Sequence, residues 1–245
     1  TDQVIPCSVS REDAEKGFKD YVCKKKFVPR AFYNKKQVES ITGVYFPYWH
    51  YNTRLEGKMQ GEARNVRVWR TGNTEYTETK YYQVSREGDV KLENLTENAL
   101  GKANQELICG VMPYDFKDVK KFQLGFLSGF LAEKRDIEKK QIEKKVQQEA
   151  RESAEKLMRE QINGYSSVSV KNADFRALKE KWSYTLLPVW TITYKAKNGK
   201  IYYFSMNGQT GKVYGELPTD YKKISLVSGI VSLVTLVILL LGGLA

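Results

Sequence analysis

The sequence has few of the residues that build metal sites and hydrolase active sites, with three cysteines and one histidine in 245 residues. Cys7, Cys23 and Cys109 lie far apart and form no CxxC pair, so we expect no zinc ribbon and no metal ligands in this stretch of chain. A sparse, odd set of cysteines also argues against a disulfide framework and fits a reducing compartment. His50 has no nucleophile motif to serve as a general base, so we expect no catalytic residue, no cofactor and no enzyme activity.

Charge is absent from the C-terminal end of the sequence. The run "ISLVSGIVSLVTLVILLLGGLA", from Ile224 to Ala245, would form a helix about 33 Å long, against a bilayer hydrocarbon core of roughly 30 Å. Lys222 and Lys223 stand just before this run, and nothing charged follows it. The positive-inside bias places these flanking lysines, and the residues before them, in the cytoplasm. The sequence therefore predicts a single-pass protein of the cell membrane, with 221–245 as its transmembrane anchor.

Positive charge is abundant elsewhere, with a formal net charge of +11 and a pI near 9.3. Such an excess favours an anionic partner, either nucleic acid or an anionic membrane. The run "KKKFVPRAFYNKK" interleaves basic and aromatic residues. Its basic members form the candidate basic patch: Lys24, Lys25, Lys26, Arg30, Lys35 and Lys36. Three interpretations of this patch stay open: a solvated helix end, a surface facing anionic lipid, and a single-strand nucleic-acid surface.

Two helices are expected before the anchor. Ser10 would cap the first, with Asp13 in the place that completes a capping box. The second runs over 136–162, with Asp136 as its N-cap and Gly164 after its end. Its narrow apolar stripe consists of Ile142, Val146, Ala150, Ala154 and Leu157. This stripe predicts packing on a sheet or on one partner.

Each helix is followed by a stretch typical of antiparallel strands. In the first stretch, from Val38 to Val90, several strands are predicted by turn signals at Gly57, Gly61, Gly72-Asn73 and Gly88-Asp89. In the second stretch, separate strands are predicted for "YSSVSV", "WSYTLLPVWTITYKA", "IYYFSMN" and "KVYGEL", with a hairpin turn at Asn198-Gly199.

The two stretches contain similar phrases, "GVYFPYWHYN" and "YTLLPVWTIT", whose prolines are 188 − 47 = 141 residues apart. Pro47 and Pro188 cannot donate a ladder hydrogen bond, so each marks an edge, a strand start or a bulge. Trp49 and Trp190 share a face with their prolines. Core packing is the favoured interpretation of both tryptophans, and docking of a ligand or protein is the alternative.

The shared plan of the two halves predicts an α+β fold of two helix-plus-antiparallel-meander units, which form a pseudo-repeat. The first unit covers 1–121. The second covers 122–220 and contains the long helix. The transmembrane helix follows it.

Six phrases in order along nearly the whole chain resemble the bacterial TFIIB-type zinc-ribbon-containing membrane proteins. They are "VIPCSVSREDAEKGFKDYVCKKKFVP", "GVYFPYWHYN", "TEYTETKYYQVSREGDV", "MPYDFKDVKKFQLGFLSGFLAEKRD", "LLPVWTITYKAKNGKIYYFSMNGQTGKVYGELP" and the apolar tail. Members of that family carry zinc ribbons ahead of this region, and "TDQVIPC" is similar to the start of their central domain. The resemblance thus implies zinc only in a preceding ribbon. It also implies the company of SPFH-domain and phage-shock-type proteins in membrane maintenance. The ending "GKIYYFSMNGQTGKVYGELP" is similar to that of PepSY-type domains, which are binding or inhibitory modules.

We therefore expect a non-enzymatic, membrane-anchored adaptor or scaffold on the cytoplasmic face that binds other membrane-associated proteins. The helix over 136–162 and the edges near the two Pro-Trp strands are the expected protein-binding surfaces. Lys24–Lys26 and Lys222–Lys223 would add attraction to anionic lipid of about 1 kcal/mol per residue. The alternative is a membrane-tethered nucleic-acid-binding protein. Basic residues stand beside acidic ones in every segment and form no long stripe, so nucleic acid is the less favoured partner.

Overall fold

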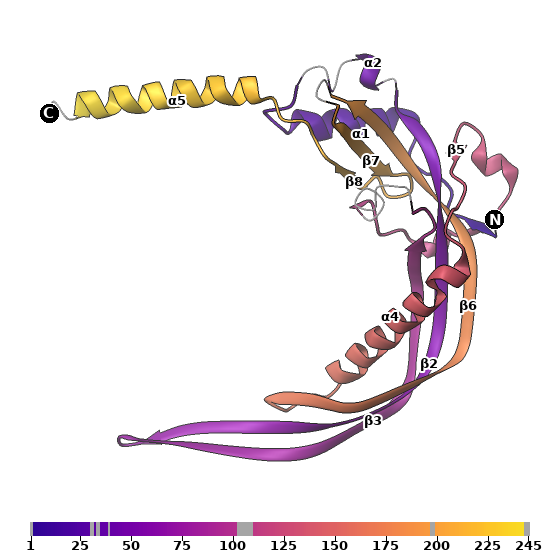
Figure 1. Ribbon diagram of the computed structural model, residues 1–245, viewed down its shortest axis with the longest axis vertical. Helices are drawn as coiled ribbons and strands as arrows, with labels where there is room; N and C mark the ends of the chain where they lie inside the picture. The colour runs from indigo at the N-terminus through magenta and orange to yellow at the C-terminus, as the bar shows by residue number, and fades with distance from the viewer. Residues whose placement is uncertain are drawn as a thin grey trace.

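A computed structural model shows a long curved sheet with helices packed on it and one isolated helix at the C-terminal end (Figure 1). The structure describes residues 2–29, 32, 35–38, 40–101, 110–196 and 199–242. Helix accounts for 30% and strand for 45%, which confirms the α+β class. The strands are β1 (Gln3–Val4), β2 (Thr42–Thr71), β3 (Thr74–Asn98), β4 (Lys120–Lys121), β5 (Leu131–Ala132), β6 (Ser167–Lys195), β7 (Ile201–Asn207) and β8 (Val213–Gly215). The helices are α1 (Arg11–Cys23), α2 (Lys35–Val38), α4 (Lys139–Glu160) and α5 (Tyr221–Gly242), with short 3₁₀ turns η2 (Phe116–Asp118) and η3 (Leu124–Leu127).

All of these strands belong to one sheet. Its main path is β3-β2-β6-β1-β4, with β5 paired to β2 and with β7 and β8 continuing from β6. Strands from both predicted units are thus neighbours in a single sheet, and the two-unit pseudo-repeat is not confirmed. The boundaries 1–121, 122–220 and 221–245 stay predictions.

The strands β2 and β3 form one long hairpin instead of the several short strands that the glycines predicted. The only predicted turn of this stretch that is a turn in the structure lies at Gly72-Asn73, where Gly72 has φ +61°. Gly57, Gly61 and Gly88 lie inside the strands. A Cβ at Gly57 would lie 2.5 Å from the Phe175 ring, so this glycine permits a close approach and makes no turn.

The strand β6 likewise joins two predicted strands into one of 29 residues. The segment between them is rich in charge, which is typical of a loop. In the structure these side chains form ion pairs across to β2: Arg176 with Glu56 at 2.8 Å, and Lys171 with Glu62 at 3.4 Å. Pairing along β2 therefore keeps the whole segment extended.

We call the part of the sheet that extends beyond the body the arm, made of residues 53–93 of β2 and β3 and residues 167–181 of β6. Figure 1 shows the arm curving away from the body, with α4 along its inner face. The helix α4 begins at Lys139 with Glu138 as its N-cap, two residues after the predicted cap, because the Gln141 side chain accepts the N–H of Glu138 at 2.6 Å. The expected cap, Asp136, instead accepts the N–H of Gly101.

The apolar stripe of α4 packs on the arm. Ile142, Val146, Ala150 and Ala154 are buried, as predicted, and the fifth buried residue is Met158. Leu157 was expected in its place but is 43% exposed. At the other end of the body, α1 begins as predicted, since the Ser10 hydroxyl accepts the N–H of Asp13 at 3.1 Å.

The two Pro-Trp phrases lie on neighbouring antiparallel strands and pair with each other. Pro47 lies opposite Leu186, and Pro188 lies opposite Tyr45. The pair at the centre is Phe46 and Leu187, which are themselves 187 − 46 = 141 residues apart. A local two-fold axis through this pair therefore relates the two phrases.

Candidate functional site

Each proline lies at a point where, along one edge of its strand, one neighbouring strand ends and another begins. The carbonyl of Pro47 accepts the N–H of Ala99, immediately after β3 ends, and β5 pairs farther back along β2. The carbonyl of Pro188 accepts the N–H of Gly208, between the pairing of β6 with β1 and with β7. A missing N–H breaks no ladder at such a junction. The prolines thus lie in the middle of the sheet, at points that act as local edges.

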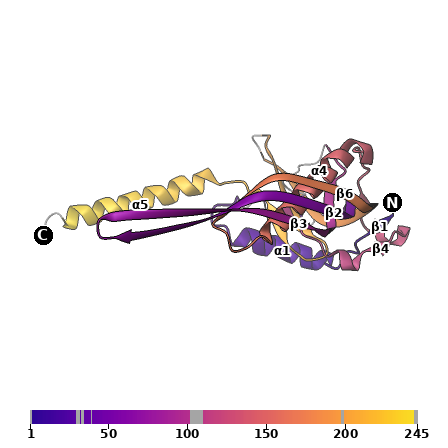
Figure 2. The same ribbon diagram turned by 90° about the horizontal axis from the view of Figure 1, so that it is seen from below.

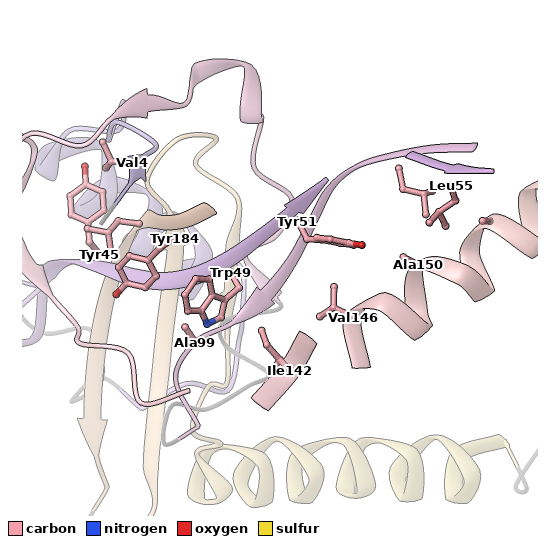
Figure 3. Close-up of a cluster of buried hydrophobic side chains, with 13 residues drawn as sticks. Val4, Tyr45, Trp49, Tyr51, Leu55, Ala99, Ile142, Val146, Ala150 and Tyr184 are labelled. Carbon is pink, nitrogen blue, oxygen red and sulfur yellow. The ribbon is translucent and has the colours of Figure 1, made fainter. Parts of the chain in front are cut away.

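Trp49 belongs to the core between the sheet and α4. Its side chain is 8% exposed, and its indole N–H donates to the carbonyl of Ile137 at 2.9 Å. Tyr184 on the neighbouring strand lies 5.5 Å away, and the Arg135 guanidinium lies 5.3 Å from the indole centroid. Figure 3 shows Trp49 among side chains of both the sheet and α4. This environment favours packing over docking.

Trp190 is also buried, at 6% exposure, and its indole N–H donates to the carbonyl of Val9 at 3.0 Å. Phe130 lies 5.0 Å from it and also 5.1 Å from Tyr45, so this ring joins the two halves of the core. No sequence feature singled out Phe130, because it lies in a segment without periodicity.

One edge of Trp190 lines a surface groove of about 560 Å³, which we call the Trp190 groove. Val9, Ile41 and Phe130 form its apolar wall, and Ser10, Arg11 and Thr42 are among its polar residues. Cys7 also lines it. Burial raises the pKa of the Cys7 thiol above its ordinary value, so this thiol is protonated at neutral pH. The groove can receive an apolar side chain beside a polar rim.

A second groove, of about 620 Å³, lies where α5 leaves the body. It is lined by Lys24, Lys25, Lys26, Phe27, Leu217 and Ile224, among others. The N–H of Asp220 donates to the carbonyl of Phe27 at 2.7 Å, and the Lys223 ammonium donates to the carbonyl of Val28 at 2.9 Å. The structure therefore brings Lys24–Lys26 together with the flanking lysines Lys222 and Lys223, across about 200 residues of sequence.

We call these five side chains the lysine collar. Lys24, Lys25 and Lys26 are exposed, and within the described ranges no carboxylate lies in ion-pairing distance of them. Lys223 is within 3.7 Å of Asp220. Of the other members of the predicted patch, Arg30 lies outside the described residues, and so do the side chains of Lys35 and Lys36.

The helix that follows the collar is long and apolar enough to cross a bilayer. The span Tyr221–Leu241 has a mean hydropathy of 2.8, and none of it is buried in the body. This observation supports the predicted anchor by length and composition.

His50 lies on the opposite face of the sheet from Trp49. It is buried, stacks on Phe116 at 4.3 Å, and its Nε2 lies 3.1 Å from Oδ1 of Asn94. Burial lowers the pKa of His50, which is therefore neutral at pH 7. Across the residues whose placement is given, no cluster of three or more His, Cys, Asp or Glu is arranged to hold a metal ion. The zinc expected in a preceding ribbon stays a prediction.

The outer face of the arm carries charge of both signs. Arg54 pairs with Asp89, and Lys58 pairs with Glu87 at 2.8 Å. A hollow of about 720 Å³ on this face has Lys91, Lys179 and Lys181 beside Asp89 and Glu93. Basic side chains thus alternate with acidic ones along the arm, which is unlike the continuous basic track of a nucleic-acid surface.

The comparisons with known proteins found similarity along nearly the whole chain. An uncharacterized protein of Bacillus subtilis (strain 168), YdjG, is 28% identical over 246 residues, which cover 98% of this chain and 72% of that protein. No family model matches the chain. No solved structure matches it either. The resemblance to the TFIIB-type zinc-ribbon membrane proteins stays a prediction.

Proposed function

We propose that this chain is a non-enzymatic adaptor on the cytoplasmic face of the cell membrane. The helix α5 crosses the bilayer, the lysine collar rests on anionic lipid, and the Trp190 groove receives a partner protein. SPFH-domain and phage-shock-type membrane proteins are the candidate partners that the family resemblance implies.

The observation that carries this proposal is the attachment of the 24–28 turn to the first turn of α5. Hydrogen bonds from Asp220 and Lys223 hold the two together, so five lysines surround the point where the chain would enter the membrane. Lysines at this level favour the cytoplasmic side and add attraction to anionic headgroups of about 1 kcal/mol each.

The orientation can be tested with Cys23, which is exposed beside the collar. In a chain carrying Cys7→Ser and Cys109→Ser, a membrane-impermeant maleimide should label Cys23 only after the cells are permeabilised. The same chain with Cys23→Ser is the control. Labelling in intact cells would place the body outside and contradict the proposal.

Partner binding can be tested by affinity capture of the full-length chain in mild detergent from nuclease-treated extracts. Thr42→Trp fills the Trp190 groove from a partly exposed strand position, where an aromatic residue is tolerated. Ser169→Trp is the matched control at an exposed position of β6. Specific membrane proteins should be lost from the first variant and retained by the second. A capture dominated by nucleic acid and its binding proteins would contradict the adaptor and support the alternative.

A further inference from the structure

The far end of the arm differs from the rest of the sheet. The last residue of β2 that pairs with β6 is Arg64, opposite Ser167. From Asn65 to Lys80 the hairpin is therefore a ribbon of two strands, which we call the arm tip. A two-stranded ribbon by itself is at best marginally stable in water. Asn65 and Val66 still hydrogen-bond the 164–166 turn, and beyond them the arm tip has open edges and open faces.

Both faces of the arm tip expose apolar side chains. Trp69 is 42% exposed and stacks on Tyr76, which is 46% exposed, with ring centroids 5.5 Å apart. Val66 and Val68 lie on the other face at 41% and 56% exposure. Directly opposed residues of a hairpin share a face, and successive residues alternate between faces. Trp69 and Tyr76 therefore lie on one face and the two valines on the other, so neither face is purely polar.

The charged side chains of the arm tip leave an excess of positive charge. Glu75 is paired with Arg70 at 3.7 Å, and Glu78 is paired with Lys80 at 3.4 Å. Arg67 lies over the Trp69 ring, 5.6 Å from its centroid. From Asn65 to Lys80 there are three basic side chains against two acidic ones. A surface of this charge is complementary to an anionic one.

The arm tip and α5 project to the same side of the body. Figure 1 shows the two at opposite ends of a crescent, both directed toward its open side, and Figure 2 shows that they point in the same direction. From Ser225 to Leu241 every residue of α5 is exposed, so the body constrains the helix only through its first turn. A membrane crossed by α5 therefore lies on the side toward which the arm tip points.

We infer that the arm tip is a second membrane contact, which rests in the anionic headgroup layer of the bilayer that α5 crosses. Trp and Tyr beside Arg and Lys form the composition that is enriched at this interface. A protein partner would cover one face, whereas a headgroup layer surrounds both. The unpaired backbone groups at the ribbon edges prevent deeper entry into hydrocarbon. The inference rests on the proposed anchor but is independent of partner binding.

Tryptophan fluorescence can test this contact, because α5 contains no tryptophan. The full-length chain would be placed in nanodiscs of phosphatidylcholine and phosphatidylglycerol, with and without brominated lipids. Trp49 and Trp190 are buried, and the half-buried Trp182 packs against Tyr51 with ring centroids 4.4 Å apart. Trp69, at 42% exposure, is therefore the residue placed to meet the quencher. Brominated lipid should quench part of the wild-type emission, and Trp69→Phe should lose that part. Leu124→Ser is the control, because it removes an 80% exposed apolar side chain from the body and should leave the quenching unchanged.

Equal quenching of the wild-type chain and Trp69→Phe in nanodiscs would overturn this inference and leave the anchor standing. A chain that does not enter nanodiscs at all would overturn the anchor and this inference with it. If hydrogen exchange shows protection of 65–80 only in discs that hold two copies, the arm tip binds a second copy, and the lipid contact is wrong.

Discussion

At the residue scale, the two tryptophans of the repeated phrase stabilise the fold through the same two kinds of contact. Each fills a gap between the sheet and the elements that pack on it, and each donates its indole N–H to a backbone carbonyl that has no strand partner there. Trp49 bonds Ile137, just before α4, and Trp190 bonds Val9, just before α1. The phrase therefore joins each helix to the sheet at the point where that helix begins.

Trp49→Ala and Trp190→Ala should each lower the free energy of unfolding by about 3–5 kcal/mol, the usual cost of removing a large buried aromatic side chain. The Phe variants should lose less, since they keep most of the volume and leave one carbonyl unpaired, at about 1–3 kcal/mol. Urea denaturation of the full-length chain in detergent measures both. Variants that are as stable as wild type yet lose their partners would assign the tryptophans to docking.

His50 should make stability depend on pH in a range where no other side chain of ordinary pKa titrates. Its folded pKa is lowered by burial and by Lys181, while Asn94 acts in the opposite sense. Below about pH 6.5 the unfolded chain binds a proton that the folded chain refuses, so stability falls as the pH falls toward the folded pKa. Denaturation at about pH 7.5 and about pH 5.5 should show this loss in wild type. His50→Gln should reduce it, and an equal loss in that variant would show that other groups cause it.

At the element scale, the arm is the feature that most distinguishes this fold. Strands of 30, 25 and 29 residues exceed the usual length several-fold. The packing of α4 on one face and the cross-strand ion pairs on the other hold the inner part of the arm together. Within the described part of the chain, the arm tip has no helix packed on it, and the ion pair between Arg70 and Glu75 at 3.7 Å is exposed.

Two glycines of the arm show whether a glycine is required because a neighbouring strand approaches closely. A Cβ at Gly61 would lie 2.4 Å from the carbonyl oxygen of Ser169, whereas a Cβ at Gly88 would meet nothing within 4 Å. Gly61→Ala should therefore destabilise the chain by about 1–3 kcal/mol, since the backbone of β6 must shift. Gly88→Ala should be neutral or stabilise it by about 0.5 kcal/mol.

Thermal denaturation of the two variants in detergent gives this comparison directly. If both alanine variants unfold at the wild-type temperature, β6 does not lie where the structure places it along β2.

At the scale of the whole molecule, the basic side chains and the curvature of the sheet point to the same side. The lysine collar, α5 and the arm tip all lie on or face one side of the crescent (Figure 1). The β4 strand lies at the far end of the body from α5, as Figure 2 shows. The turn of the arm tip reaches farther toward the open side than the base of α5, where the collar lies (Figure 1).

Neutralising Lys24, Lys25 and Lys26 to Gln should weaken binding of the chain without its anchor, residues 1–220, to anionic vesicles. At about 1 kcal/mol per lysine the loss is roughly 100-fold. Vesicle sedimentation at low salt measures it, and the difference should shrink in about 1 M salt, where the screening length is about 3 Å. The matched control neutralises three exposed lysines near β4, namely Lys117, Lys120 and Lys121. An equal loss in the control would mean that only net charge matters.

By itself the sequence determined the features that depend on short-range pattern. Three features are of this kind: the uncharged C-terminal run, the Ser10 cap and the apolar stripe of α4. Each depends only on residues within one continuous segment, because the helix repeat and the bilayer thickness set the spacing of residues within a single helix. Tertiary structure alone decided the length of the strands. Gly57 and Gly61 are suited to turns and also to close approach, and only their contacts with Phe175 and Ser169 distinguish the two roles.

Tertiary structure also decided which distant segments meet. Pairing of Phe46 with Leu187 placed both Pro-Trp phrases in one sheet, and the hydrogen bonds of Asp220 and Lys223 placed Lys24–Lys26 at the base of α5. Such contacts join residues that are far apart in sequence, and their free energy depends on the packing of the whole chain. A local pattern carries no information about them, so the candidate site became a single surface only in the folded molecule.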